Sequence, residues 1–88
     1  MKYYNADIIL IIAYQVKDTQ DIVKYSNIKA HLDQEETQIS KALRSLERKG
    51  LIEKLDTNQR LRRFRITHQG KTYAQFLIQQ MRELISIV

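Results

Sequence analysis

The chain opens with an apolar segment, Tyr3 to Lys17, that contains neither Gly nor Pro. Its length favours a helix over residues 1–17, although its β-branched Ile residues leave a strand as the alternative. Asn5 is placed to cap this helix, and Asp7 to favour its dipole. Because apolar side chains fall on more than one helical face, we expect a second subunit to cover one of these faces.

A shorter pattern follows a polar break at residues 18–21. Ile22 and Val23 form either a short extended piece or the start of a helix. Ser26 is a good N-cap for a two-turn helix that ends near Leu32, with apolar residues four apart on one face.

The helix predicted over residues 35–49 has the clearest pattern. Asp33 or Glu35 is expected to cap it, and Asp33 has capping-box spacing to Glu36. Gly50 is expected to end it. Its single apolar stripe consists of Ile39, Ala42, Leu43 and Leu46, and the opposite face is polar and basic.

Two short runs, 51–55 and 61–67, flank a polar turn and predict a β-hairpin. Phe64 and Ile66 fall on one side of the second run, and arginines on the other. Thr67 or His68 is expected to cap a last helix, 68–88, whose apolar residues recur three and four positions apart. A helix of about 20 residues is some 30 Å long. A domain this small covers only part of it, so we expect contact with a second copy.

This order of elements predicts a winged helix-turn-helix fold, mainly α with a small β-hairpin wing and a long C-terminal helix. Residues 1–88 are expected to form one domain. Within it we assign an N-terminal helix (1–17), a helix-turn-helix (21–50), a wing (51–67) and a C-terminal dimerisation helix (68–88).

Composition excludes several kinds of chemistry. The chain has no Cys and only two distant His, His31 and His68, so we expect no disulfide and no metal site. It lacks a Gly-rich phosphate loop and a nucleophile paired with a base, so neither an enzyme nor a cofactor is expected. The longest apolar run falls short of the ~20 residues that span a bilayer. The last helix has only Lys71 and Arg82 as basic residues, so we expect no membrane-surface partner either. The expected location is cytoplasmic and nucleoid-associated.

The positive charge is concentrated in one part of the chain. The formal net charge is +5, with 15 Lys and Arg against 10 Asp and Glu. Residues 41–71 hold ten of the basic residues and three acids, a net +7, and the rest of the chain has a net −2. This segregation favours one face that binds a polyanion, with double-stranded DNA as the expected partner.

Two motifs resemble the winged-helix regulators of the MarR and PadR type. They are Leu46-Glu47-Arg48-Lys49-Gly50-Leu51-Ile52 and Ile66-Thr67-His68-Gln69-Gly70. In those regulators the first motif ends the recognition helix and opens the wing, and the second ends the wing and caps the next helix. The resemblance covers about residues 26–71. It implies a homodimer on a palindromic operator, although small winged-helix dimers with one C-terminal helix are closer in architecture.

Helix 35–49 is therefore expected to read the major groove, and wing residues 54–65 the flanking groove or backbone. The candidate DNA contacts are Thr37, Gln38, Ser40, Lys41, Arg44, Ser45, Arg48, Lys54, Asn58, Gln59, Arg60, Arg62, Arg63 and Arg65. The expected dimer contacts, from the first and last helices, are Ile8, Ile9, Ile12, Tyr73, Leu77, Met81, Leu84, Ile85 and Val88.

The favoured interpretation is a dimeric, repressor-like transcriptional regulator. An architectural or plasmid- or phage-maintenance DNA-binding protein is one alternative, and a winged-helix adaptor for other proteins is the second. Mixed polar and basic side chains on the recognition helix favour base reading, and the sequence defines no effector. Glu35 and Glu36 at the start of this helix are interpreted mainly as capping residues, with cytosine reading as the alternative.

Overall fold

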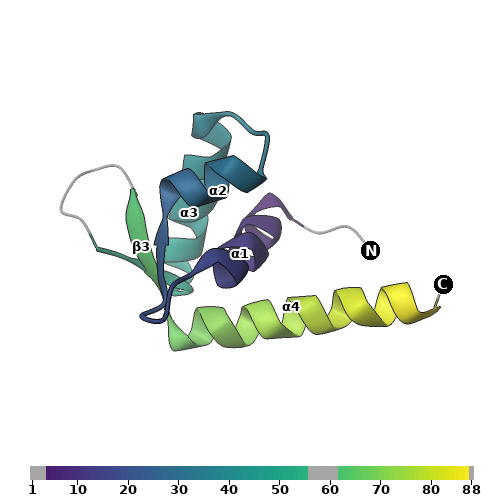
Figure 1. Ribbon diagram of the computed structural model, residues 1–88. Coiled ribbons are helices and arrows are strands. Elements are labelled where there is room, and N and C mark those ends of the chain that lie inside the picture. The colour runs from purple at the N-terminus through teal and green to yellow at the C-terminus, as the bar shows by residue number, and fades with distance from the viewer. Residues whose placement is uncertain (1–3, 56–61, 88) are drawn as a thin grey trace.

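The computed structural model describes residues 4–55 and 62–87, with side chains up to residue 83. The elements in chain order are α1 (Asn5–Val16), β1 (Ile22–Lys24), α2 (Tyr25–His31), α3 (Glu36–Arg48), β2 (Ile52–Lys54), β3 (Arg63–Ile66) and α4 (His68–Ile87). Figure 1 shows α4 running beneath the other elements and extending well past α1. The predicted mainly helical winged helix-turn-helix fold is confirmed.

The sheet has one strand more than the predicted hairpin. Ile22 and Val23 belong to β1, which resolves the ambiguity of that segment in favour of the extended form. The antiparallel order is β1-β3-β2, with Phe64 of β3 opposite Val23 on one side and opposite Lys54 on the other. Because β3 is central, the second arm of the wing is hydrogen-bonded along both edges.

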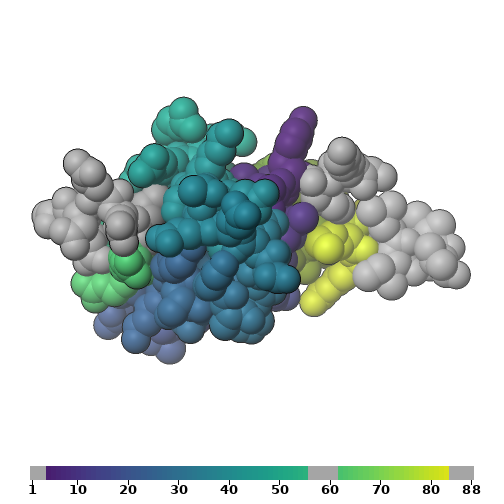
Figure 2. Space-filling model, turned by 90° about the horizontal axis from the view of Figure 1, so that it is seen from above, coloured from purple at the N-terminus to yellow at the C-terminus, as the bar shows by residue number. Residues whose placement is uncertain are grey.

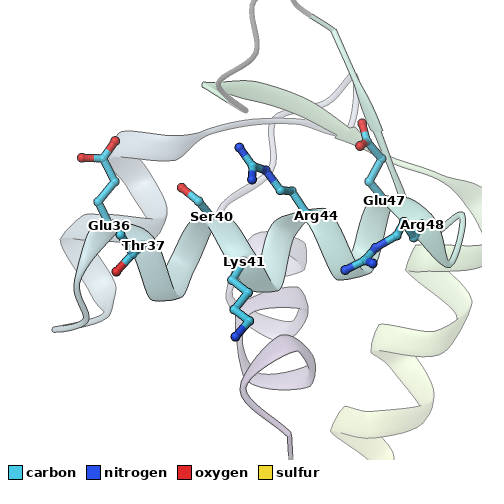
Figure 3. A pocket seen from close by; sticks show the side chains of 7 residues that line it. All are labelled: Glu36, Thr37, Ser40, Lys41, Arg44, Glu47 and Arg48. Carbon is cyan, nitrogen blue, oxygen red and sulfur yellow. The ribbon is translucent and has the colours of Figure 1, made fainter.

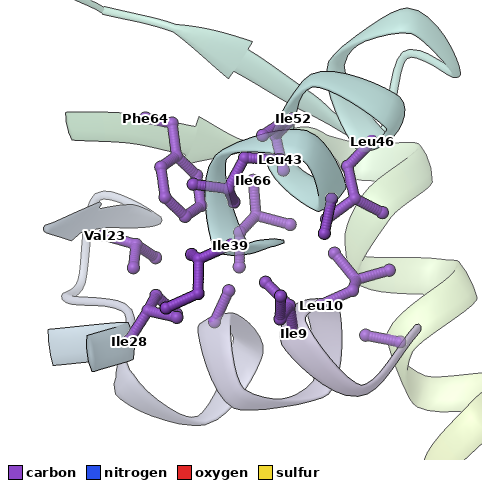
Figure 4. Packing of buried hydrophobic residues seen from close by; sticks show 13 residues of the cluster. Ile9, Leu10, Val23, Ile28, Ile39, Leu43, Leu46, Ile52, Phe64 and Ile66 are labelled. Carbon is purple, nitrogen blue, oxygen red and sulfur yellow. The ribbon is translucent and has the colours of Figure 1, made fainter. Parts of the chain in front are cut away.

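The core lies between α1, α3 and the sheet (Figure 4). α3 and β3 bury the residues that their sequence patterns predicted, whereas α1 buries Ile9 and Leu10 and leaves Ile8 exposed. Ile39, Leu43 and Leu46 of α3 are at most 1% exposed, and Phe64 and Ile66 of β3 are equally buried. This burial fixes which side of α3 faces outward.

Two caps differ from the sequence prediction. Asn5 is the first residue of α1 rather than its cap, and its side-chain amide exchanges hydrogen bonds of 2.9 and 2.6 Å with that of Gln34. Ser26 does not cap α2, because this helix starts at Tyr25, whose amide donates to the Arg62 carbonyl at 2.7 Å. Both partners are far away in sequence, where a local pattern gives no signal.

At the start of α3, the structure confirms Glu35, one of the two predicted caps. Glu35 is the N-cap, and its amide donates to Oε1 of Gln38 at 3.3 Å. The capping box therefore pairs Glu35 with Gln38, and the predicted pairing of Asp33 with Glu36 is wrong. Of the two glutamates, Glu35 serves as the cap, whereas Glu36 begins the helix proper.

The end of α3 and the start of α4 are joined through backbone contacts. Gly50 has a φ of 76°, and the amides of Gly50 and Leu51 donate to Glu47 and Leu46 in a Schellman motif. The Thr67 hydroxyl donates to the Gly50 carbonyl at 2.7 Å and accepts from the Gly70 amide at 3.0 Å, so it caps α4 as expected. The predicted caps Gly50 and Thr67 are confirmed.

Gly70 makes this approach of the two segments possible. A Cβ at this position would lie 2.0 Å from the Leu51 carbonyl oxygen, far inside van der Waals contact. We call Gly50, Leu51, Thr67 and Gly70 the α3–α4 joint. In the described part of the chain, no helix is both long and apolar enough to cross a membrane.

Candidate nucleic-acid interface

The outer face of α3 is a continuous polar surface. Its side chains line an open groove along the helix: Glu36, Thr37, Ser40, Lys41, Arg44, Glu47 and Arg48. Seen from above, α2 and α3 occupy the middle of the molecule, with β3 to one side and α4 to the other (Figure 2). The face thus sits between the wing strands and α1, where a duplex can approach it.

The side chains of this face form two rows (Figure 3). One row, on the edge nearer the strands, contains Glu36, Ser40, Arg44 and Glu47. The other row, nearer α1, contains Thr37, Lys41 and Arg48. Within the described residues, the Arg44 and Lys41 side chains have no hydrogen bond or ion pair, so both cations are available to an external anion or base.

Two predicted base readers lie on the flank of α3. Gln38 and Ser45 line a second groove, between α3 and the start of α1, together with Lys41, Lys49 and Tyr4. The side-chain oxygen of Gln38 also accepts a hydrogen bond from the Glu35 amide in the capping box. The structure therefore brings together five of the seven α3 candidates and sets Gln38 and Ser45 apart from them.

The predicted DNA contacts left out three charged members of these surfaces, although Glu36 was weighed as a reader of cytosine. Glu36 and Glu47 are on the outer face, and Lys49 is on the flank that faces α1. Helical spacing gave a signal for Glu36, since it is four residues from Ser40. An acid in the first turn was instead interpreted through the helix dipole.

The wing strands hold their arginines in different surroundings. Arg62 and Arg63 are exposed at the start of β3, and Lys54 is half-buried at the end of β2. Arg65 is bonded through Nη1 to Oε1 of Glu53 at 2.7 Å, on the sheet face opposite the core. Its charge is therefore already compensated. Asn58, Gln59 and Arg60 lie outside the described residues.

Tyr25 lies where α2, α3 and the wing meet. Its hydroxyl is buried and has no hydrogen-bond partner within the described chain. Burial raises the pKa of Tyr25, and the nearby negative charge of Glu36 raises it further, while Arg62 opposes the shift. Figure 3 shows the Glu36 carboxylate on the edge of α3 nearer the strands.

A family model, the winged helix DNA-binding domain, matches residues 6–70, from α1 into the first turn of α4. The chain belongs to this family. No curated protein matches it. Among solved structures it is similar to the "Crystal structure of SSV1 F-93", with a TM-score of 0.61 and 15% identity over 100% of this chain and 98% of that one. Identity this low shows a shared fold. The match supports the winged helix-turn-helix interpretation without singling out the MarR or PadR type.

The residues expected at a dimer interface of this winged helix DNA-binding domain divide into two groups. Ile9 and Leu77 are 0% and 3% exposed and fill the interior of their own subunit, which leaves them no surface for a second copy. Ile8 and Met81 are exposed, and Ile12 is half-buried. The side chains of Leu84, Ile85 and Val88 lie outside the described residues.

Tyr73 has a role within the subunit. It is half-buried and lies near the buried carboxyl of Asp7 on α1. Burial raises the pKa of Tyr73, and the neighbouring Asp7 carboxyl raises it further. Two exposed aromatic residues, Tyr4 and Phe76, were not among the predicted contacts.

Proposed function

We propose that this DNA-binding domain acts as a homodimeric, repressor-like transcriptional regulator that recognises specific sites in double-stranded DNA. In this proposal α3 enters the major groove, and the wing contacts the flanking groove or backbone. Binding over an operator then blocks access of the polymerase.

The observation that carries the proposal is the composition of the outer face of α3. The hydroxyls of Thr37 and Ser40 in the first half of α3 are followed by the cations of Lys41, Arg44 and Arg48 along one helical face. Hydroxyl and guanidinium groups are direct readers of base edges, whereas a protein that only coats DNA needs positive charge alone. The apolar stripe on the opposite side fixes this face outward.

The dimer is supported by the shape of the subunit. Ile8 on α1 and Met81 on α4 are 39% and 37% exposed although both are large and apolar. Figure 1 shows that the C-terminal part of α4 projects beyond the remainder of the domain, beside α1. A second copy that packs against these helices would cover the exposed side chains and place two α3 helices on one duplex.

Selection of bound duplexes from a random pool at fixed salt tests the proposal. We expect an enriched palindrome whose half-sites lie about one helical turn, 10 to 10.5 base pairs, apart. Binding without any enriched sequence and with steep salt dependence would instead indicate an architectural or maintenance protein. A chain that binds no duplex would be an adaptor for other proteins.

A further inference from the structure

The first turn of α3 contains an acidic side chain, Glu36, whose carboxylate accepts no hydrogen bond from any described residue. The structure separates the two adjacent glutamates, because the capping box uses Glu35 and Gln38. Glu36 is exposed, and its carboxylate has no hydrogen bond or ion pair to any described residue. The pKa of Tyr25 is raised by the charge of Glu36, yet the Tyr25 hydroxyl has no hydrogen-bond partner within the described chain and so does not donate to this carboxylate.

The position of Glu36 is the one from which a recognition helix reads bases. In helix-turn-helix proteins the N-terminal residues of this helix contact base edges. Glu36 lies in the same row as Ser40 and Arg44 (Figure 3), so it faces whatever these two side chains face. A carboxylate against the phosphate backbone is repelled, whereas in the groove it can accept a hydrogen bond from the N4 amino group of cytosine.

We propose that Glu36 is a specificity-determining residue that selects a cytosine in the half-site, while Arg44 in the same row selects a guanine. This inference rests on the proposed function, since it needs α3 in the major groove. The two residues are eight positions apart, or about 12 Å along the helix axis. That distance matches roughly three to four base-pair steps, which sets the expected separation of the two selected pairs.

The test compares the duplexes selected by the parent protein with those selected by Glu36→Ala and Glu36→Gln. The parent is expected to enrich a cytosine at one half-site position, and Glu36→Ala to lose that preference by about tenfold, within the range of one direct base contact. Glu36→Gln should move the preference towards adenine, because an amide bonds adenine with two hydrogen bonds. The guanine selected through Arg44 should persist in both variants.

Glu47→Gln is the matched control, because it removes one negative charge from the other end of the same row. It is expected to raise affinity for all duplexes alike and to select the parental sequence.

An identical base preference in the parent and in Glu36→Ala overturns the inference and leaves the proposed function standing. An equal change of preference in Glu36→Gln and Glu47→Gln also overturns it, because charge alone would then be responsible. A parent protein that enriches no sequence overturns the proposed function and this inference together.

Discussion

Arg44 and Arg65 carry the same guanidinium group in different surroundings. Arg44 is exposed on the outer face of α3 without a partner in the described residues, whereas Arg65 is bonded to Glu53 at 2.7 Å. Both were predicted as DNA contacts, because neither the net charge nor the alternation of polar and apolar residues distinguishes a paired arginine from an unpaired one. Which of them is already paired depends on the register of β2 against β3, which sets Glu53 opposite Arg65.

Arg44→Ala is expected to weaken binding to the selected operator by about 1–3 kcal/mol, because it removes a direct contact to a base edge. Titration of labelled operator at fixed salt measures the change. Arg82→Ala, which removes an equal charge from the exposed surface of α4, is the control and should have little effect. Equal affinities of Arg44→Ala and the parent would remove α3 from the proposed base contacts.

Gly70→Ala is expected to lower the free energy of unfolding by about 1–3 kcal/mol, the usual cost of forcing extra atoms into a packed site. The added Cβ meets the Leu51 carbonyl oxygen, which belongs to backbone and yields little. Urea unfolding followed by circular dichroism measures this difference. Gln69→Ala, an exposed neighbour, should change stability by no more than about 0.5 kcal/mol. A Gly70→Ala midpoint equal to that of the parent would contradict the close approach.

Among the elements, α3 was predicted most completely and β1 least. The period, cap and terminal glycine of α3 all lie within its own segment, so local physics defines it. β1 has three residues, and its extended form depends on pairing with β3, some forty residues later in the chain. No local pattern carries that information, so the sequence left the segment ambiguous and predicted a hairpin in place of a three-stranded sheet.

The turn before β1 links three elements through one carboxylate. Asp21 has a φ of 65° and bonds the ammonium groups of Lys71 on α4 and Lys17 after α1, at 2.9 and 3.0 Å. The hydrogen bonds from Lys71 and then Lys17 hold the pKa of Asp21 below its usual 3.8. The ionised carboxylate therefore stabilises the fold above about pH 4, and this stabilisation is lost as the pH falls through the lowered pKa.

Asp21→Asn is expected to be less stable than the parent at pH 7, and the difference should shrink as the pH falls below about 4 and through the lowered pKa of the parent carboxylate. Asn also tolerates the left-handed backbone, so the comparison isolates the charge. Urea unfolding at pH 7 and pH 3 provides the measurement. In the control Asp18→Asn, the amide oxygen still accepts from the amides of Gln20 and Ile22. A stability gap for Asp21→Asn that is independent of pH would contradict this account.

The wing should act mainly through phosphate contacts. Arg62→Ala combined with Arg63→Ala is expected to reduce the slope of log K against log salt by roughly one to two units, because two exposed cations at the start of β3 are removed. Arg82→Ala, which removes a cation from the exposed surface of α4, serves as the control and should leave the slope nearly unchanged. The same slope in the double variant and the parent would exclude these arginines from the phosphate interface.

On the scale of the whole molecule, the sequence identified apolar helix faces but not what covers them. Ile9 and Leu77 were assigned to a dimer interface together with Ile8 and Met81. The structure buries the first two within one subunit and leaves the second two exposed. Periodicity reports that a face is apolar, and only the packing of α1 against α4 and α3 decides how much of it remains for a second copy.

Replacement of both Ile8 and Met81 by Glu is expected to yield folded monomers, because two charges would be buried in the proposed dimer interface. Sedimentation at micromolar concentration measures the mass, and circular dichroism checks the fold. Phe76→Glu is the control, since Phe76 is 54% exposed and lies about 140° around α4 from Met81. A monomeric parent protein under the same conditions would rule out the proposed dimer.

The α3–α4 joint has a consequence for the spacing of the operator. In this joint, backbone atoms of α4 lie in close contact with the segment that ends α3. We therefore expect α3 to rotate little relative to α4, the proposed dimerisation helix. In a dimer built through this joint, the distance between the two α3 helices would be fixed. Insertion of a single base pair between half-sites turns them apart by roughly a tenth of a helical turn. The stiffness of this joint should thus make the protein a strict measure of distance along DNA.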